Sequence, residues 1–510
     1  MKKYSDLEYL KLSKGERVKY KFLSFFAAIP VAIWNAIKGI GNWFKKAGLA
    51  IGNELKDIVM TFVQGDWKTR LSYLIMGFGS IARGQVLRGL LFLIFEVVFI
   101  GYMILAGVYW MSMLPSLGLI GPHKEYHELL DTYVTVYGDN SFKILLYGVL
   151  TMFFIVAFIF TWRLNIKQNK IAESILRSGK KLKSGKDDLR SLVDDQFHKT
   201  LLALPLTGIL IFTVMPLVFM ILVAFTNYDG THDGFSNNLF TWVGLENFNT
   251  MLHWSGGGST NYSATFGEVL SWTLMWAFFA TFTNYFLGMA VAMMINKKGI
   301  RLKKVWRTIL VTTIAIPQFI SLLYVSKMFA KNGIINGILM DLGWITKALP
   351  FWEDPTWARI TVIAINVWIG IPYLMLIATG ILMNIPADLY ESAKIDGASG
   401  WQQYSKITLP YMLFVTGPYL LTSFTGNINN FNVIFLLTGG APTNINASGA
   451  AGSVGYTDLL ITWLFKITTG AESKYYLASV IGILVFVIMA IFTLVVYGVL
   501  PSIKNEEDFQ

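Results

Sequence analysis

Uncharged polar residues recur at helical spacing inside two long apolar stretches of the chain. A spacing of i, i+4 and i+7 places such residues on one face of an α-helix. Amides and hydroxyls donate and accept hydrogen bonds, and an aromatic ring can stack on an apolar ring surface. This chemistry suits a neutral polyhydroxylated ligand such as a sugar, rather than an ion, a phosphate or a carboxylate. The two sets are Asn366, Gly370 and Tyr373 in one stretch, and Ser423, Asn427 and Asn430 in the other.

Polar side chains in a membrane span face the bundle interior, a partner or a cavity. Hydrogen bonding between packed helices is the alternative, but two matched sets with aromatic residues nearby favour a cavity. The last six apolar stretches lack Asp and Glu in their middles, which argues against a proton- or sodium-coupled carrier. Glu96 lies in the first stretch, and we expect it to hydrogen-bond a neighbouring helix or Arg88.

A polar, helix-forming segment from Tyr390 to Ala398 separates these two apolar stretches. Gly397 interrupts it, and a glycine within a helix costs about 1 kcal/mol relative to alanine. We therefore expect two short helices that meet at a bend near Gly397 to Gly400. Pro410 is expected to open the next long helix, where its missing N–H costs little. A helix-bend-helix element that projects from a membrane helix pair could be gripped by a soluble partner; an ordinary connecting loop is the alternative.

Eight apolar stretches approach or exceed the length of about 20 residues that a membrane-spanning helix needs. The chain is 54% hydrophobic and 14% charged, whereas soluble domains carry about 25% charged residues. These features predict an all-α polytopic membrane protein with about eight transmembrane helices, bent at Pro216, Pro317 and Pro372. The stretches are approximately 90–113, 144–162, 201–225, 269–295, 308–328, 360–383, 411–437 and 476–500.

Charge differs strongly between alternate loops. Lysine and arginine cluster in residues 163–199 and 297–307, whereas the loop from Asn227 to Phe266 has none. The positive-inside rule then predicts that both termini and the segment around Glu391 are cytoplasmic. The formal net charge of +11 therefore indicates cytoplasmic membrane loops rather than a nucleic-acid partner.

The expected organisation has four parts. Residues 1–89 form a basic amphipathic extension without the features of a cleavable signal peptide. Within it, residues 21–45 carry an amphipathic helical stripe broken by Pro30, which is expected to lie in the membrane interface or, alternatively, to form a short extra span. The other parts are the first two spans (90–163), a basic cytoplasmic loop (164–200) and a six-helix core (201–505) with a coupling loop at 385–410.

Sites for metals and nucleotides are not evident. The chain has no Cys, and its five His are scattered without ligand spacing. Residues 178–187 resemble a phosphate-binding loop only faintly, because five residues separate the glycines and Asp187 follows the lysine. Residues 255–259 are expected to be a flexible part of the outer loop. No cofactor is expected on this chain, so ATP and magnesium would belong to a partner ATPase.

The segment around Glu391 matches the signature of ABC-importer permeases: Glu-Ala-Ala, three residues, Gly, nine residues, Ile, one residue, Leu-Pro. Ser392 is the only departure, and it is conservative. The motifs at 366–373, 385–398, 406–410 and 429–442 also resemble the larger membrane subunit of bacterial maltose/maltodextrin ABC importers, which are type I permeases. The matching signature positions, with Asp396 as a further expected coupling residue, are Glu391, Ser392, Ala393, Asp396, Gly397, Ile407, Leu409 and Pro410.

The resemblance also implies a sugar site between the sixth and seventh spans. Ile369 replaces a leucine of the family, and Gly426 stands where the maltose permease has an aromatic residue, so a different or longer saccharide is plausible. The loop 227–266 is too short for the folded periplasmic domain of enterobacterial relatives, which implies a Gram-positive type with a lipid-anchored binding protein. The implied contact residues are Asn366, Ile369, Gly370, Tyr373, Ser423, Gly426, Asn427 and Asn430.

These observations predict a permease subunit of an ATP-driven oligosaccharide importer in a bacterial cell membrane. Its expected partners are a second permease, a cytoplasmic ATPase dimer and an external sugar-binding protein. An importer of another neutral saccharide is one alternative. A membrane-embedded glycosyltransferase is another, and it would need acidic groups such as Asp229, Asp233 and Glu246 in the outer loop.

Overall fold

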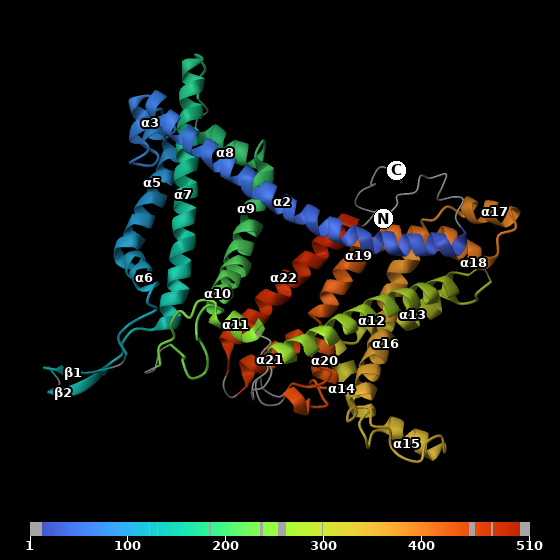
Figure 1. Ribbon diagram of the computed structural model, residues 1–510. Helices are drawn as coiled ribbons and strands as arrows, with labels where there is room; N and C mark the ends of the chain where they lie inside the picture. The colour runs from blue at the N-terminus through green and yellow to red at the C-terminus, as the bar shows by residue number, and fades with distance from the viewer. Residues whose placement is uncertain are drawn as a thin grey trace. The chain divides into compact units, whose positions relative to one another are not determined.

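The computed structural model describes residues 13–121, 123–129, 131–182, 185–234, 238–252, 262–297, 299–447, 454–470 and 473–499. These residues are mostly helical, with one β-hairpin (Figure 1). Seven helices are long and apolar enough to span a membrane, and a bent helix pair raises the number to eight among the described residues. The eight expected stretches therefore correspond to seven helices and one bent pair.

The chain divides into two compact units. The N-terminal unit comprises Lys38–Asn247 and Lys474–Ser479, and the C-terminal unit comprises Met1–Ile37, Phe248–Ser473 and Val480–Gln510. The third span packs in the N-terminal unit, where Phe219 contacts Phe142 of the second span. The predicted six-helix core from residue 201 thus starts with a span that belongs to the N-terminal unit; its boundary stays a prediction.

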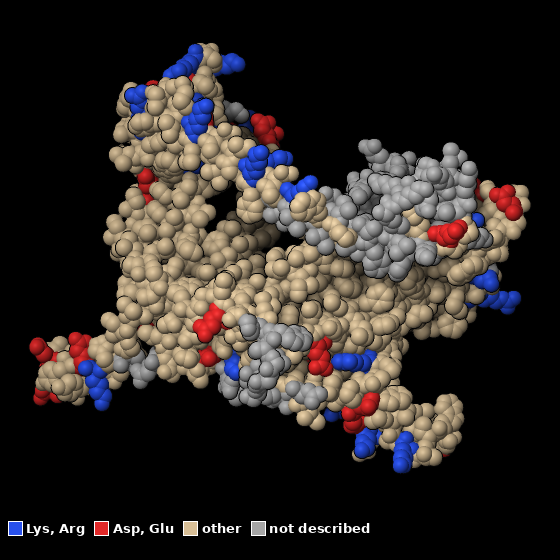
Figure 2. Space-filling model, viewed as in Figure 1, with Lys and Arg blue, Asp and Glu red and all other residues tan. Residues whose placement is uncertain are grey.

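The N-terminal unit is built on three membrane helices. A hairpin of β1 (His123–His127) and β2 (Thr132–Val136) joins the first two, with Tyr126 paired to Tyr133. Lysine and arginine gather at the end of this unit where α3 and the C-terminal end of α7 lie (Figure 2). Its helices are α2 (Lys14–Gln64, from Lys38 onward), α3 (Trp67–Leu71), α4 (Phe78–Ile81), α5 (Val86–Tyr102), η1 (Met103–Gly107), α6 (Val108–Met113), α7 (Ser141–Arg177), α8 (Gly185–Val193), α9 (Phe197–Ile209), η2 (Leu210–Val214), α10 (Met215–Val223) and, across the boundary between the units, α11 (Glu246–Leu252).

The structure adds two local details to the expectations for this part of the chain. The helix α2 continues through Pro30, because one proline removes a single backbone hydrogen bond from a helix of 51 residues. The basic loop after the second span is partly helical, since α7 extends to Arg177 and α8 follows. The second span therefore projects well beyond its apolar segment.

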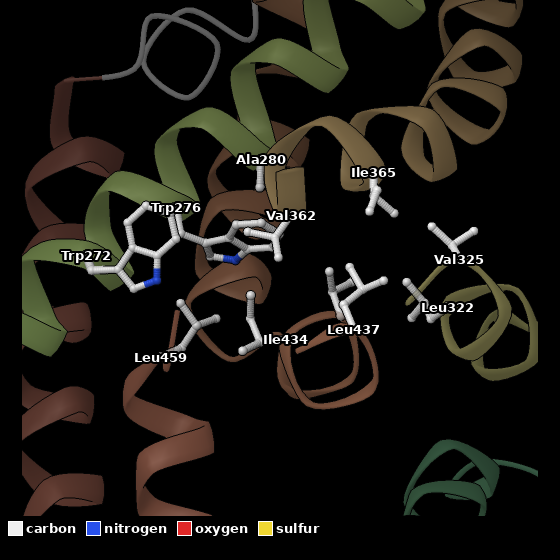
Figure 3. Close-up of a cluster of buried hydrophobic side chains, with 11 residues drawn as sticks. Trp272, Trp276, Ala280, Leu322, Val325, Val362, Ile365, Ile434, Leu437 and Leu459 are labelled. Atoms are coloured by element: carbon white, nitrogen blue, oxygen red, sulfur yellow. The ribbon is translucent and has the colours of Figure 1, made fainter. Parts of the chain in front are cut away.

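The C-terminal unit is organised around α12. This helix packs along α16 and α19, and α13 and α14 bend by 91° at Pro317. Figure 3 shows one buried cluster, in which Trp272 and Trp276 of α12 lie at one end and Leu322 of α14 at the other, with side chains of α16 and α20 between them. The helices are α12 (Tyr262–Asn296), α13 (Lys303–Ala315), α14 (Gln318–Met328), α15 (Ile334–Asp341), α16 (Pro355–Leu382), α17 (Ala387–Ile395), α18 (Gly400–Gln403), η3 (Tyr404–Thr408), α19 (Leu409–Ile428), α20 (Phe431–Leu437), η4 (Ile445–Ala447), α21 (Leu460–Thr469) and α22 (Tyr475–Val499), whose first residues lie in the N-terminal unit.

The seventh span differs from its expected course. Its α-helical part α19 begins at Leu409 with Pro410 in the first turn, as expected. Helical backbone nevertheless continues back through η3 and α18 to Gly400, and the span ends at Ile428, before the expected limit at residue 437. The turn before Pro410 widens into the π-helix η3, in which Leu409 N–H donates to the Tyr404 carbonyl. The π-helix η2 likewise precedes Pro216. A wider turn accommodates a proline ring that would clash in a regular α-helix.

Candidate functional site

Part of the first polar set faces α12. A Cβ atom placed on Gly370 would lie 2.4 Å from Asn284 Nδ2, so α16 approaches α12 closely at this glycine. Asn366, one turn earlier, is buried. Within the described residues, Asn284 Oδ1 and Asn366 Nδ2 have no hydrogen-bond partner. Gly370 therefore lies where α16 packs on α12, but neither amide atom makes, within the described part of the chain, the interhelical hydrogen bond that was the alternative to a cavity.

The amides of the second set hold the break between α19 and α20. Asn427 Nδ2 donates to Thr281 Oγ1 of α12 at 3.0 Å, and Trp276 Nε1 donates to the Asn427 carbonyl at 3.1 Å. Asn430 Nδ2 donates to Asn427 Oδ1 at 3.3 Å, and Asn430 Oδ1 caps the start of α20. Both asparagines therefore have structural bonds that fix their orientation.

A cavity of about 340 Å³ lies where the bent pair meets α16. Ile369 and Tyr373 line it, as the sugar-site expectation requires, and the Tyr373 side chain is half exposed. Gln318 and Ser321 also line it; the sequence interpretation missed both. Pro317 could have indicated them, because a proline bend inside a span frees backbone groups that a cavity can satisfy. The full lining is Thr313, Ile314, Ala315, Ile316, Pro317, Gln318, Ser321, Trp368, Ile369 and Tyr373.

Tyr419 relates this cavity to the second set. Its side chain interacts with Ser423 on the same helix and, electrostatically, with Tyr373 of α16. Gly426, two turns beyond Tyr419, is exposed, and a Cβ atom there would meet nothing within 4 Å. Tyr419 is a polar residue of α19 that the spacing argument missed, whereas Ser423 and Gly426 do not line the cavity that Ile369 and Tyr373 share.

A larger apolar cavity of about 1160 Å³ is lined by α12, α19 and α22. Phenylalanine and leucine side chains dominate its walls, and it reaches Ile385 and Leu389 beside the predicted coupling segment. Lys406 provides a charged group at this end of the lining. Such a surface offers few hydrogen bonds to a sugar.

The predicted coupling segment forms the expected helix-bend-helix. Helix α17 ends at Ile395, and Gly397 has a φ of +74°, a left-handed conformation that glycine adopts without strain. Ser399 then starts α18 with a capping box, in which its hydroxyl accepts from Gln402 N–H and the Gln402 side chain accepts from Ser399 N–H. The Tyr390 hydroxyl bonds the Thr408 hydroxyl at 2.8 Å and so ties α17 to η3.

This segment presents both polar and apolar side chains to its surroundings. Ile395 and Trp401 are 87% and 73% exposed, although the Trp401 ring also contacts Tyr404, and they form an exposed apolar surface beside the polar signature residues. The exposed signature residues are Glu391, Ser392, Asp396, Gly397 and Pro410, whereas Ala393, Ile407 and Leu409 are half-buried.

Carboxylates elsewhere have structural roles. Glu96 Oε2 accepts from Met76 N–H at 2.8 Å, so Glu96 has a structural hydrogen bond, but to the turn between α3 and α4 rather than to a neighbouring helix; Arg88 Nη1 donates to Gln168 Oε1 at 3.0 Å. Asp229 in the outer loop accepts from the backbone N–H groups of Thr231 and His232. These hydrogen bonds hold the pKa of Asp229 below its ordinary value against the opposing effect of burial. Among the described residues, no group of three or more His, Asp or Glu could hold a metal ion.

The chain combines apolar spans with a bent helix pair beside an uncharged cavity and an exposed helix-bend-helix. These features are those of a polytopic membrane permease. The chain belongs to the binding-protein-dependent transport system inner membrane components, whose family model matches residues 284–505. The match covers the C-terminal part, where the coupling segment lies.

Curated relatives extend the similarity towards the N-terminus. The maltodextrin transport system permease protein MalC of Streptococcus pneumoniae is 32% identical over 450 residues, covering 86% of this chain and 97% of MalC. The galactooligosaccharides transport system permease protein GanP of Bacillus subtilis is 33% identical over 72% of this chain and 85% of GanP. The maltose/maltodextrin transport system permease protein MalF of Escherichia coli is 35% identical over 45% of this chain and 44% of MalF.

Proposed function

We propose that this permease imports a neutral oligosaccharide, most closely of the maltodextrin type, as one of two membrane subunits of an ABC importer. The observation that carries the proposal is the uncharged cavity at the bend of α13 and α14, which Tyr373 and Gln318 line together with apolar residues. Hydroxyl, amide and aromatic groups recognise sugar hydroxyls and sugar ring faces together. The names of MalC and GanP support an oligosaccharide as the cargo.

The remaining substrate-site residues enter this proposal with different roles. Ile369 and Tyr373 contact the sugar from α16, while Ser423 and Gly426 contact it from α19. The packed residues of the two sets contact the sugar only if α12, α16 and α19 shift relative to one another during transport. These residues are Asn366, Gly370, Asn427 and Asn430. Such a shift belongs to an alternating-access cycle, in which rigid elements move around a fixed site.

The other subunits are part of the same proposal. An external binding protein delivers the sugar, and a cytoplasmic ATPase dimer, which holds the ATP and magnesium, grips α17 and α18. Both termini lie in the cytoplasm, and the short outer loop fits a Gram-positive arrangement with a lipid-anchored binding protein. Glu391 makes a polar contact to the ATPase, while Ile395 and Trp401 supply apolar contact area.

Ligand-stimulated ATP hydrolysis tests this function. The chain is reconstituted in proteoliposomes with its companion permease, ATPase and binding protein, and a panel of neutral oligosaccharides is added. We expect stimulation and uptake with one class of α- or β-linked oligosaccharide. Stimulation by no saccharide, in a complex that still hydrolyses ATP, would overturn the proposed cargo. Transfer of sugar to an acceptor lipid without ATP would instead support a glycosyltransferase.

A further inference from the structure

Residues 38–64 of α2 are attached to α7 along one edge. Arg163 Nη2 lies 2.5 Å from Glu54 Oε2 and 2.6 Å from Asp57 Oδ2. Lys170 forms a second ion pair with Asp57. Further along, Arg177 Nη2 donates to the carbonyl of Gln64 at 3.1 Å. An acidic edge of α2 is therefore paired with the basic, C-terminal end of the second span.

The position of these ion pairs along α7 determines how far α2 lies from the hydrocarbon core of the membrane. Arg163 directly follows Trp162, the last residue of the apolar stretch. At a rise of 1.5 Å per residue, Lys170 lies about 10 Å farther along the helix. The polar interfacial layer of a bilayer begins where its hydrocarbon core ends and extends over several ångströms. Glu54 and Asp57 are thus held at the membrane surface.

The face of α2 next to this edge is apolar and largely exposed, with Phe62 at its C-terminal end packed edge-on against Tyr73. Phe44, Ile51, Leu55 and Phe62 are spaced by seven, four and seven residues, which places them on one helical face. Their exposed fractions are 64%, 61%, 58% and 47%. An apolar face this exposed beside a membrane surface is the geometry of an interfacial helix.

Two lysines, Lys45 and Lys56, border the apolar face on the side away from α7; we call them the basic margin. Lys45 and Lys56 are exposed and eleven residues apart, which is close to three full turns. Seen down the helix axis, the acidic edge, the apolar face and this margin follow one another in order. Lysines at the border of an apolar face reach lipid phosphates while their stems stay in contact with the acyl region.

We propose that residues 38–64 of α2 form a lipid-contacting arm on the membrane surface at the C-terminal end of α7. The acidic edge holds the arm to α7, the apolar face enters the boundary between headgroups and acyl chains, and Lys45 and Lys56 bind anionic phosphates. The arm thereby anchors the first two spans to an anionic bilayer. This inference concerns the N-terminal unit and does not depend on the identity of the cargo.

The absence of native cysteine allows a direct test with single nitroxide labels on the full chain in phosphatidylglycerol–phosphatidylcholine vesicles. Phe44→Cys, Ile51→Cys and Leu55→Cys report the apolar face, and Asn42→Cys and Asn53→Cys are matched controls on the opposite face. We expect labels on the apolar face to be more accessible to oxygen than to a water-soluble nickel chelate. The three labels should also lie at the same shallow depth in the bilayer. The control labels should show the reverse order.

Three results would overturn the proposal of a lipid-contacting arm. Low accessibility of the apolar-face labels to both reagents would mean that protein covers the face. High nickel accessibility at every label would place the helix in water. A depth that increases steadily from Leu55 to Phe44 towards the bilayer centre would show a spanning segment.

A charge variant tests the basic margin separately. Lys45→Gln combined with Lys56→Gln should reduce the depth signal of the Ile51 label in anionic vesicles and leave it unchanged in phosphatidylcholine alone. Lys46→Gln, on the opposite side of the helix, is the control and should change neither. Equal signals for the double variant and the unmodified chain in anionic vesicles would refute phosphate binding by these lysines.

Discussion

The Tyr390 hydroxyl and the Thr408 hydroxyl are 2.8 Å apart and join α17 to the π-helical turn below the seventh span. Thr408 of η3 is buried. Helix α17 itself makes few contacts, and most of its side chains are exposed. If the ATPase grips α17 as proposed, this hydrogen bond and the turn at Gly397 would connect the movement of α17 to α19. The relationship explains how a mostly exposed element can move a membrane helix.

Tyr390→Phe removes this bond while retaining the ring. One hydrogen bond contributes about 1 kcal/mol, so we expect sugar uptake per ATP hydrolysed to fall about fivefold in proteoliposomes, with normal amounts of assembled complex. Thr408→Val should have a similar effect, and the double variant should be no worse than either single one. Additive losses would show that the two hydroxyls act independently.

Gly397→Ala tests the bend. A side chain in the left-handed region costs about 1 kcal/mol or more, and a Cβ atom here meets nothing within 4 Å, so the effect is confined to the backbone. We expect weaker binding of the ATPase to detergent-solubilised permease, by about fivefold. Gly400→Ala is the matched control, because Gly400 has equal space and no positive φ. Equal affinities of the two variants would contradict a role for the bend.

The element types were predictable from sequence, but several contacts were not. Apolar length and the glycine within a polar helix indicated the spans and the bend at Gly397, because both are local properties. The partner of Gly370 could not be derived, since the i, i+4, i+7 spacing defines a face and not the helix that covers it. The continuation of the helix through Pro410 was also missed, because a π-turn absorbs the proline. Gln318, which lines the same cavity as Tyr373, fell outside the spacing rule, as did Tyr419.

The attachment of α2 to α7 should depend on pH. Hydrogen bonds from Lys170 and then Arg163 hold the pKa of Asp57 below its ordinary value of 3.8. Because the pKa is depressed in the folded state, the stabilisation is complete above pH 3.8 and is lost as the pH falls through the lower, folded value. A nitroxide at Ala50→Cys should gain mobility in that acidic window.

Asp57→Asn provides the control for this titration. Two partly exposed ion pairs contribute about 1 kcal/mol together, so the label should be more mobile at neutral pH in this variant. Its mobility should then change little on acidification. A variant that titrates like the unmodified chain would assign the effect to another group.

Tyr373→Phe tests the cavity at the bent pair. Loss of one hydrogen bond to the sugar should raise the KM for uptake about fivefold, corresponding to about 1 kcal/mol. Basal ATP hydrolysis should stay unchanged, because Tyr373 is remote in sequence from the coupling segment and half exposed. Tyr324→Phe is the control, since Tyr324 is exposed on α14 but does not line the cavity. An unchanged KM in the Tyr373 variant would exclude its hydroxyl from sugar binding.

Gly426→Phe should shift the preference of the permease towards shorter saccharides. The glycine is exposed and has open space around its Cα, so an aromatic side chain fits and fills volume that a longer sugar would occupy. A new stacking surface contributes about 0.5–1.5 kcal/mol, which predicts a change of roughly two- to tenfold in the ratio of kcat/KM for a disaccharide to that for a hexasaccharide.

Gly380→Phe, at an exposed and equally open glycine of α16, should leave the ratio unchanged. Because both variants add the same apolar side chain to a membrane helix, a shift shared by the two would reflect altered folding or lipid contact. A shift confined to Gly426→Phe would place the sugar against α19 at this residue and explain the specificity by the volume that glycine leaves open.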